Sequence, residues 1–126
     1  MITAIVLYDM PNSITREQCL AHYRTIAPSF LEAPGFVRKQ FIYSVDGNVG
    51  GGVYMWETLE AAKAFFSGPW LDGIRERYRT EPKISYFETF VVADRKDGVN
   101  GVTEDSTKEL VFVGSRAIDA MRRGGG

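Results

Sequence analysis

Two strand-like segments of this chain are apolar on both faces, and this pattern restricts the folds it can adopt. If residues 2–8 form a strand, one face of it carries Ile2, Ala4, Val6 and Tyr8, and the other face carries Thr3, Ile5 and Leu7. Residues 83–93 alternate in the same way, with Glu88 as the charged exception. The two helix-like stretches of the chain can cover one face of the resulting sheet. A second copy is the economical cover for the other face, so we predict a homodimer.

The first half of the chain predicts a strand, a helix and a β-hairpin. Apolar residues recur at three- and four-residue spacing from Cys19 to Leu31, as on one face of a helix. Thr15 and Gln18 have the spacing of a capping box at its start. Segments 36–45 and 51–57 are expected to pair as antiparallel strands around Asp46-Gly47-Asn48, a typical hairpin turn.

The second half adds a helical stretch and a last strand. The helical period begins after Thr58, is interrupted at Gly68-Pro69, and resumes to Tyr78. Residues 83–93 are expected to form the fourth strand. We therefore predict an α+β fold with the ferredoxin-like order β-α-β-β-α-β and a four-stranded antiparallel sheet. Residues 1–94 are expected to form this domain. Residues 95–126 read as a polar linker and C-terminal tail, either disordered or in contact with the partner subunit.

Composition and charge argue against several classes of protein. The chain has 126 residues, 44% of them hydrophobic, with no apolar run long enough to span a membrane. Its net charge is −1 and no basic stripe is present, so no nucleic acid is expected as a partner. We see no secretory leader after Met1, so a cytoplasmic location is expected. With Cys19 and His22 as the single residues of their kinds, we expect no metal and no bound cofactor.

Several short motifs in this order resemble the dimeric α+β barrel superfamily. They are Pro34-Gly35-Phe36 leading to Lys39, Gly51-Gly52-Val53-Tyr54, Glu57, and Ala61-Ala62 to Phe65. The resemblance is to its branch of small monooxygenases related to the antibiotic-biosynthesis monooxygenases, and it extends to about Asp94. It implies a dimeric barrel with a pocket between the sheet and the helices. Because this superfamily also contains isomerases and cyclases, the fold alone does not decide the reaction.

The resemblance makes candidates of the residues that point into that pocket. His22 is the candidate base, and Lys39 with Tyr54 would stabilise a substrate anion. Residues expected to bind the substrate are Trp56, Trp70, Phe65 and Tyr43. Each has a plainer alternative, such as a helix-edge histidine, a lysine that snorkels from the sheet edge, or aromatic core packing. In a regular strand Lys39 shares a face with Val37, Phe41 and Tyr43, and a single bulge after Phe36 would reverse this facing.

These residues predict a cofactor-independent monooxygenase, an oxidoreductase acting on a small aromatic or polyketide-like substrate. A deprotonated phenol or enol can itself reduce dioxygen, so the protein need supply only a base, a dry pocket and anion stabilisation. Two alternatives stay open: a metal-free lyase, isomerase or cyclase using the same pocket, and a non-catalytic dimeric binder of a hydrophobic metabolite.

Overall fold

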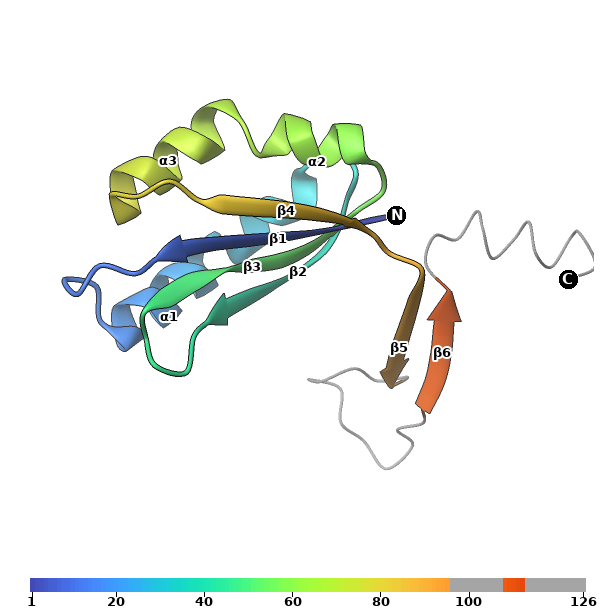
Figure 1. The fold of residues 1–126 in the computed structure, drawn as a ribbon, viewed down its shortest axis with the longest axis horizontal. Helices are drawn as coiled ribbons and strands as arrows, with labels where there is room; N and C mark the ends of the chain where they lie inside the picture. Colours follow the sequence, from blue (N-terminus) through green and yellow to red (C-terminus); the bar gives the residue numbers. More distant parts are fainter. Residues whose placement is uncertain (96–107, 113–126) are drawn as a thin grey trace, which may run out of the picture. The chain divides into compact units, whose positions relative to one another are not determined.

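The computed structural model describes residues 1–95 and, for the backbone alone, residues 108–112. Two compact units make up the chain (Figure 1): one is Ile2–Glu88, and the other contains Met1 and the described residues from Thr89 onward. The predicted linker and tail, residues 95–126, lie outside the described residues apart from Arg95 and 108–112. No helix in the described part of the chain is long and apolar enough to cross a membrane.

The first unit has the predicted order and sheet. Its four antiparallel strands are ordered β2-β3-β1-β4, with the bounds β1 Ile2–Asp9, β2 Phe36–Tyr43, β3 Val49–Trp56 and β4 Lys83–Glu88. Its helices are α1 Arg16–Ile26, the 3₁₀ helix η1 Ala27–Glu32, α2 Leu59–Phe65 and α3 Gly68–Tyr78. The α+β, ferredoxin-like prediction is therefore confirmed.

Local side-chain chemistry explains where the helices begin and end. The Thr15 hydroxyl accepts a hydrogen bond from Gln18 N at 3.1 Å, while Gln18 Oε1 accepts one from Thr15 N at 2.8 Å, which confirms the capping box. The predicted single helix to Leu31 was wrong, because the chain tightens into η1 after Ile26. Pro28 lies in the first turn of η1 and has no N–H to continue the α-helical ladder.

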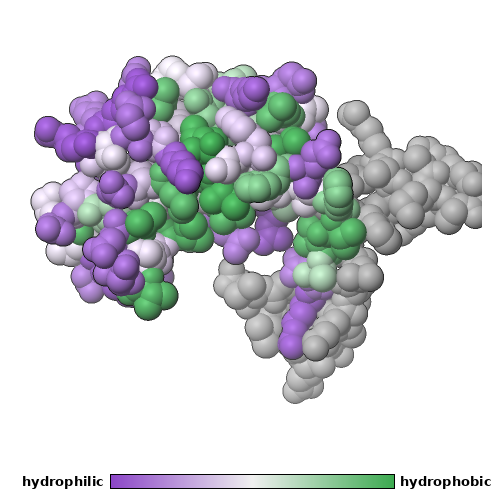
Figure 2. All heavy atoms as spheres, in the orientation of Figure 1, coloured by the Kyte–Doolittle hydropathy of each residue, from purple (hydrophilic) through white to green (hydrophobic). Residues whose placement is uncertain are grey.

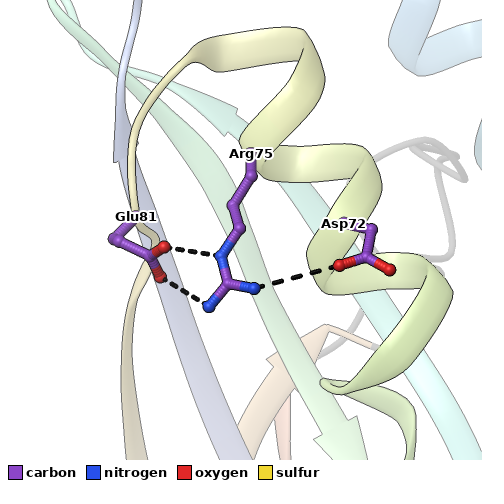
Figure 3. Close-up of polar contacts among 3 residues, drawn as sticks. All are labelled: Asp72, Arg75 and Glu81. Carbon is purple, nitrogen blue, oxygen red and sulfur yellow. Dashed lines mark hydrogen bonds and ion pairs between the residues drawn. The ribbon is translucent and has the colours of Figure 1, made fainter.

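The second predicted helix is interrupted where the sequence indicates. α2 starts at the cap Thr58, whose hydroxyl accepts a hydrogen bond from Ala61 N, and α3 starts at Gly68. At the end of α3, Arg75 reaches forward to Glu81 in the loop before β4 (Figure 3). Arg75 Nε lies 2.5 Å from Glu81 Oε1, and Arg75 Nη1 lies 3.9 Å from Asp72 Oδ1. All three side chains are exposed, so they fix the turn more than they stabilise the fold.

The predicted fourth strand, residues 83–93, is two strands of two different sheets. β4 ends at Glu88, which pairs with Ile2, the first residue of β1. In the second unit, β5 Val91–Arg95 pairs antiparallel with β6 Lys108–Phe112. The charged Glu88 that breaks the apolar alternation thus marks the end of the four-stranded sheet.

A bulge in β2 determines which side chains face the helices. Phe36 pairs with Trp56, whereas Arg38 pairs with Met55, so Val37 is the extra residue. The reversal of Lys39 expected from such a bulge does not occur: Lys39 still faces the helices, because the pairing is regular from Arg38 onward. Val37 is displaced instead and is 41% exposed, which corrects its predicted place on the Lys39 face.

The helices cover one face of the sheet and leave the other open. The buried core lies between sheet and helices and consists of Ala4, Val6, Tyr8, Met10, Cys19, Tyr23, Phe30, Tyr54, Trp56, Ala62, Phe66 and Tyr78. By strand alternation, the opposite face of the sheet carries Ile5, Leu7, Ile42, Val53, Met55 and Phe87. Hydrophobic side chains gather over the strands in Figure 2. The apolar character of the second face, predicted from the sequence, is therefore present in the fold.

Candidate active site

A cavity of about 320 Å³ lies between the sheet and the helices of the first unit. Its walls come from the helix-facing side of β1, β2 and β3 and from α1, η1, α2 and α3. Most of the predicted site residues line it, namely His22, Lys39, Tyr54, Phe65 and Trp70. A cavity of this size, with apolar walls and a few polar groups, has the form of a small-molecule site.

Lys39 projects from β2 into a cage of aromatic rings. Its Nζ lies 3.7 Å from the ring centre of Phe41, 3.9 Å from that of Phe30 and 4.5 Å from that of Tyr54. The aliphatic stem crosses Gly52, where an added Cβ would lie 2.6 Å from Lys39 Cε. The lysine stem therefore occupies the space that the missing side chain of Gly52 leaves.

The amine of Lys39 is largely buried and has no anionic partner. Among the described residues, none forms an ion pair or side-chain hydrogen bond with Nζ, and no Asp or Glu lines the cavity. Burial disfavours the ammonium form and lowers the pKa of Lys39 from 10.5 to about 7. The ring faces attract the cation and oppose this shift in part. Both the ammonium and the free amine are therefore populated near neutral pH.

His22 lies on α1 at the edge of the same cavity and is partly exposed. Its pKa is lowered from the ordinary value by burial, and further by the positive charges of Arg77 and Lys39. The imidazole is consequently neutral at pH 7 and able to accept a proton. His22 thus lies at the edge of its helix, as the plainer alternative expected, and this edge also borders the cavity.

Tyr54 presents a phenol that stays protonated. Its side chain is 2% exposed, and burial raises its pKa, an effect that interaction with the Trp70 side chain opposes in part. A buried neutral phenol can donate a hydrogen bond to an oxygen atom in the cavity. The ring of Tyr54 forms one wall of the lysine cage.

Two predicted substrate-binding residues lie away from the cavity. Trp56 is 0% exposed and packs edge-on against Phe36 and Phe66, so its position is that of a core residue supporting Tyr54. Its indole Nε1 has no hydrogen-bond partner among the described residues. Tyr43 borders a smaller hollow of about 110 Å³, next to Arg16 and α1.

The sequence analysis did not single out three other tyrosines that line the cavity: Tyr8, Tyr23 and Tyr78. The Tyr8 and Tyr23 hydroxyls lie 2.7 Å apart, and the rings of Tyr8 and Tyr78 stack with centres 4.1 Å apart. Gly51 N donates to the Tyr23 hydroxyl at 3.2 Å. Burial raises the pKa of Tyr8 and Tyr23, so these phenols stay neutral. The sequence could have indicated them, because each is a tyrosine at a position where the spacing of apolar residues predicts a core side chain.

The cavity combines a neutral imidazole, an amine that titrates near pH 7 and buried phenol donors within aromatic walls. Such a set can remove a proton from a weakly acidic substrate and stabilise the resulting oxyanion. Among the described residues, no three His, Cys, Asp or Glu side chains lie close enough together to hold a metal ion.

Comparisons with solved structures identify the fold. A monooxygenase from the gene ActVA-Orf6 of Streptomyces coelicolor, in complex with nanaomycin D, aligns with a TM-score of 0.55 at 20% identity, covering 70% of this chain and 86% of that one. A proposed antibiotic biosynthesis monooxygenase from Nitrosomonas europaea aligns with a TM-score of 0.56 at 18% identity, covering 71% and 98%.

A third similar structure is that of a mutant of SnoaB, a cofactor-independent oxygenase from Streptomyces nogalater, with a TM-score of 0.53 at 16% identity, covering 70% of this chain and 91% of that one. No protein-family model and no curated protein matches the sequence. The resemblance predicted from the sequence motifs is thus confirmed at the level of the fold: this chain has the α+β fold of the antibiotic biosynthesis monooxygenases.

Proposed function

We propose that this protein is a cofactor-independent monooxygenase that oxidises a small phenol or enol with an aromatic or polyketide-like body. The observation that carries the proposal is the amine of Lys39, held in an aromatic cage at the cavity wall without an anionic partner. A substrate oxyanion would supply the missing partner, and the surrounding rings would accept the flat apolar remainder.

In this proposal the substrate itself reduces dioxygen. His22 takes the acidic proton, and the ammonium of Lys39 with the Tyr54 hydroxyl stabilises the phenolate or enolate oxygen. The electron-rich anion then donates electrons to O₂, a carbon–oxygen bond forms, and loss of water leaves a new carbonyl. For a CH₂ group beside the aromatic system the balance is R₂CH₂ + O₂ → R₂C=O + H₂O.

The similar structures support the choice of reaction. Two of them are named as a monooxygenase and as a cofactor-independent oxygenase. Their identity to this chain is 20% and 16%, so they support the proposal through the fold alone. The phenols and the amine in the cavity of this chain supply the chemical argument.

We also infer that a second copy of the chain covers the open face of the sheet, where Ile5, Val53 and Met55 lie beside Phe87, which is 52% exposed. A homodimer through this face would bury an apolar surface that is otherwise in contact with water. The cytoplasmic location expected from the sequence stays a prediction.

The test is oxygen uptake with naphthols and anthrones, which carry acidic phenol or enol protons and fit an aromatic cavity. We expect uptake with stoichiometric quinone or ketone formation. His22→Gln should lower kcat about 10²- to 10⁴-fold, and Lys39→Met should lower it too, while the exposed Lys63→Arg should leave it unchanged.

The outcomes separate the alternatives. Full turnover by His22→Gln and Lys39→Met on an identified substrate would remove the assigned roles. Conversion of substrate without oxygen consumption would favour a lyase, isomerase or cyclase. Tight binding with the ligand recovered unchanged would favour a binding protein.

A further inference from the structure

The amine of Lys39 has the surroundings of a nucleophile as well as those of an anion-binding group. The cavity places it among the rings of Phe30, Phe41 and Tyr54, within a space that admits a small molecule. Lys39 and Phe30 also border a second hollow of about 440 Å³ along the edge of β2.

We propose that Lys39 condenses with an aromatic aldehyde or ketone in this cavity to form an imine. This activity goes beyond the proposed oxygenation, because it uses the neutral form of the amine and requires no oxygen. The aromatic walls select the class of carbonyl compound, since they hold a flat apolar body against the rings while its carbonyl group meets the nitrogen.

The charges around Nζ favour the free amine. The titratable and charged groups that line the cavity are His22 and Tyr23 on α1, Arg77 and Tyr78 on α3, Tyr8 on β1 and Tyr54 on β3. None of these is a carboxylate that would hold Lys39 as an ammonium. Two are basic, and burial keeps the phenols of Tyr8, Tyr23 and Tyr54 neutral. Desolvation thus acts without compensation from an anion, which is one way in which proteins activate a lysine.

The condensation balances without any further reactant. The nitrogen lone pair of Lys39 adds to the carbonyl carbon, and one N–H proton moves to the carbonyl oxygen to give a carbinolamine. The hydroxyl gains a second proton, the C–O bond breaks, and water leaves as the C=N bond forms. Loss of the remaining N–H proton replaces the proton that left with the water, so both hydrogens of the water come from the amine. Neutral His22, on the rim of the same cavity, is the group available to accept and return protons.

The experiment is reductive trapping with benzaldehyde and cyanoborohydride on the full chain at pH 7, under argon. Benzylation of each lysine is followed by peptide mass spectrometry. An amine with a pKa near 7 is about half neutral at this pH, whereas an ordinary lysine is neutral at only about one part in 2,500. Allowing for its lower intrinsic nucleophilicity, we expect Lys39 to be labelled roughly 100-fold faster than the exposed Lys63.

Because both lysines are compared within one wild-type chain, the result does not depend on any variant folding. Labelling of Lys39 no faster than that of Lys63 would overturn the proposal. Labelling of Lys39 by formaldehyde but not by benzaldehyde would overturn the aromatic class of the carbonyl compound. In Lys39→Arg the fast label should disappear while that on Lys63 stays. Since oxygen is absent, failure of the oxygenase proposal would leave this result unaffected, and the reverse holds as well.

Discussion

Replacing Lys39 by methionine should stabilise the protein near neutral pH. Methionine has a similar length and an apolar, flexible side chain that can lie along Gly52 and within the aromatic cage. The substitution removes the desolvation of a buried amine, and it also removes the attraction between that amine and three rings. The sign of the result depends on which of these two effects is larger.

The structure allows both effects to be estimated. Lowering the pKa from 10.5 to about 7 corresponds to a penalty of about 4 to 5 kcal/mol on the ammonium form. The shift in pKa comes from desolvation, and the attraction of the rings for the cation is a separate contribution. Three cation–π contacts at about 0.5–1 kcal/mol each return roughly 2 kcal/mol. Desolvation is larger, and Lys39→Met should raise the free energy of unfolding at pH 7 by about 2–3 kcal/mol.

The pH dependence provides a second test of the same reasoning. Between the folded pKa of about 7 and the unfolded value of 10.5, the unfolded chain binds more protons at Lys39 than the native chain does. The stability of the wild type should therefore rise with pH across this window. The raised pKa values of Tyr8 and Tyr54 give the opposite slope above about pH 10, so the measurement should end near pH 9.5.

The assay is urea unfolding followed by tryptophan fluorescence, at one protein concentration so that dimerisation does not change the comparison. We expect Lys39→Met to be more stable at pH 7 and the wild type to approach it as the pH rises. The exposed Lys63→Met should behave as the wild type. A less stable Lys39→Met, or parallel pH profiles for the two proteins, would refute the argument that the amine is held at a cost in free energy.

Three further substitutions test other parts of the fold. Gly51→Ala should prevent folding, because the added Cβ would lie 1.8 Å from the backbone oxygen of Val6. In Gly73→Ala, within α3, the added Cβ meets nothing within 4 Å, so this substitution should raise Tm slightly. Thermal melts of the two variants compare them directly. Tyr23→Phe should destabilise by about 1–3 kcal/mol in urea, since it removes the hydroxyl that accepts the Gly51 N–H bond, and an unchanged midpoint would contradict this. Val53→Lys, on the open face, should convert a dimer to a monomer in gel filtration, and a dimer that persists would argue for a different interface.

The fold was predictable because its determinants are local and repeated. The capping residue Thr15, the hairpin turn at Asp46-Gly47 and the strand alternation of residues 2–8 each act over a few positions, and the structure confirms them. The error in the fourth strand arose because pairing between distant segments decides where that strand ends. The end of β4 at Glu88 depends on where β1 begins, which the alternation of residues 83–93 does not encode.

The site was predictable only in part, for a related reason. His22, Lys39 and Tyr54 were chosen by the face on which each lies, and the cavity brings them together. Trp56 shares its face with Tyr54, yet the rings around it fill the space that a ligand would need. Tyr8 was passed over because a phenol in an apolar strand resembles core packing. Strand alternation indicates the direction of a side chain but not the empty volume in front of it.

The position of Lys39 links the fold to the proposed chemistry. The bulge at Val37 precedes it and Gly52 makes room for its stem, so the backbone of two strands accommodates a side chain that a methionine would replace with a gain in stability. A buried, unpaired amine is therefore not explained by packing alone. Titratable groups that line a cavity and lower the stability of the fold are concentrated at functional sites, where the same burial makes them reactive. Both the oxyanion-binding and the imine-forming proposals follow from this one amine: the first uses Nζ with its third proton, and the second uses Nζ without it.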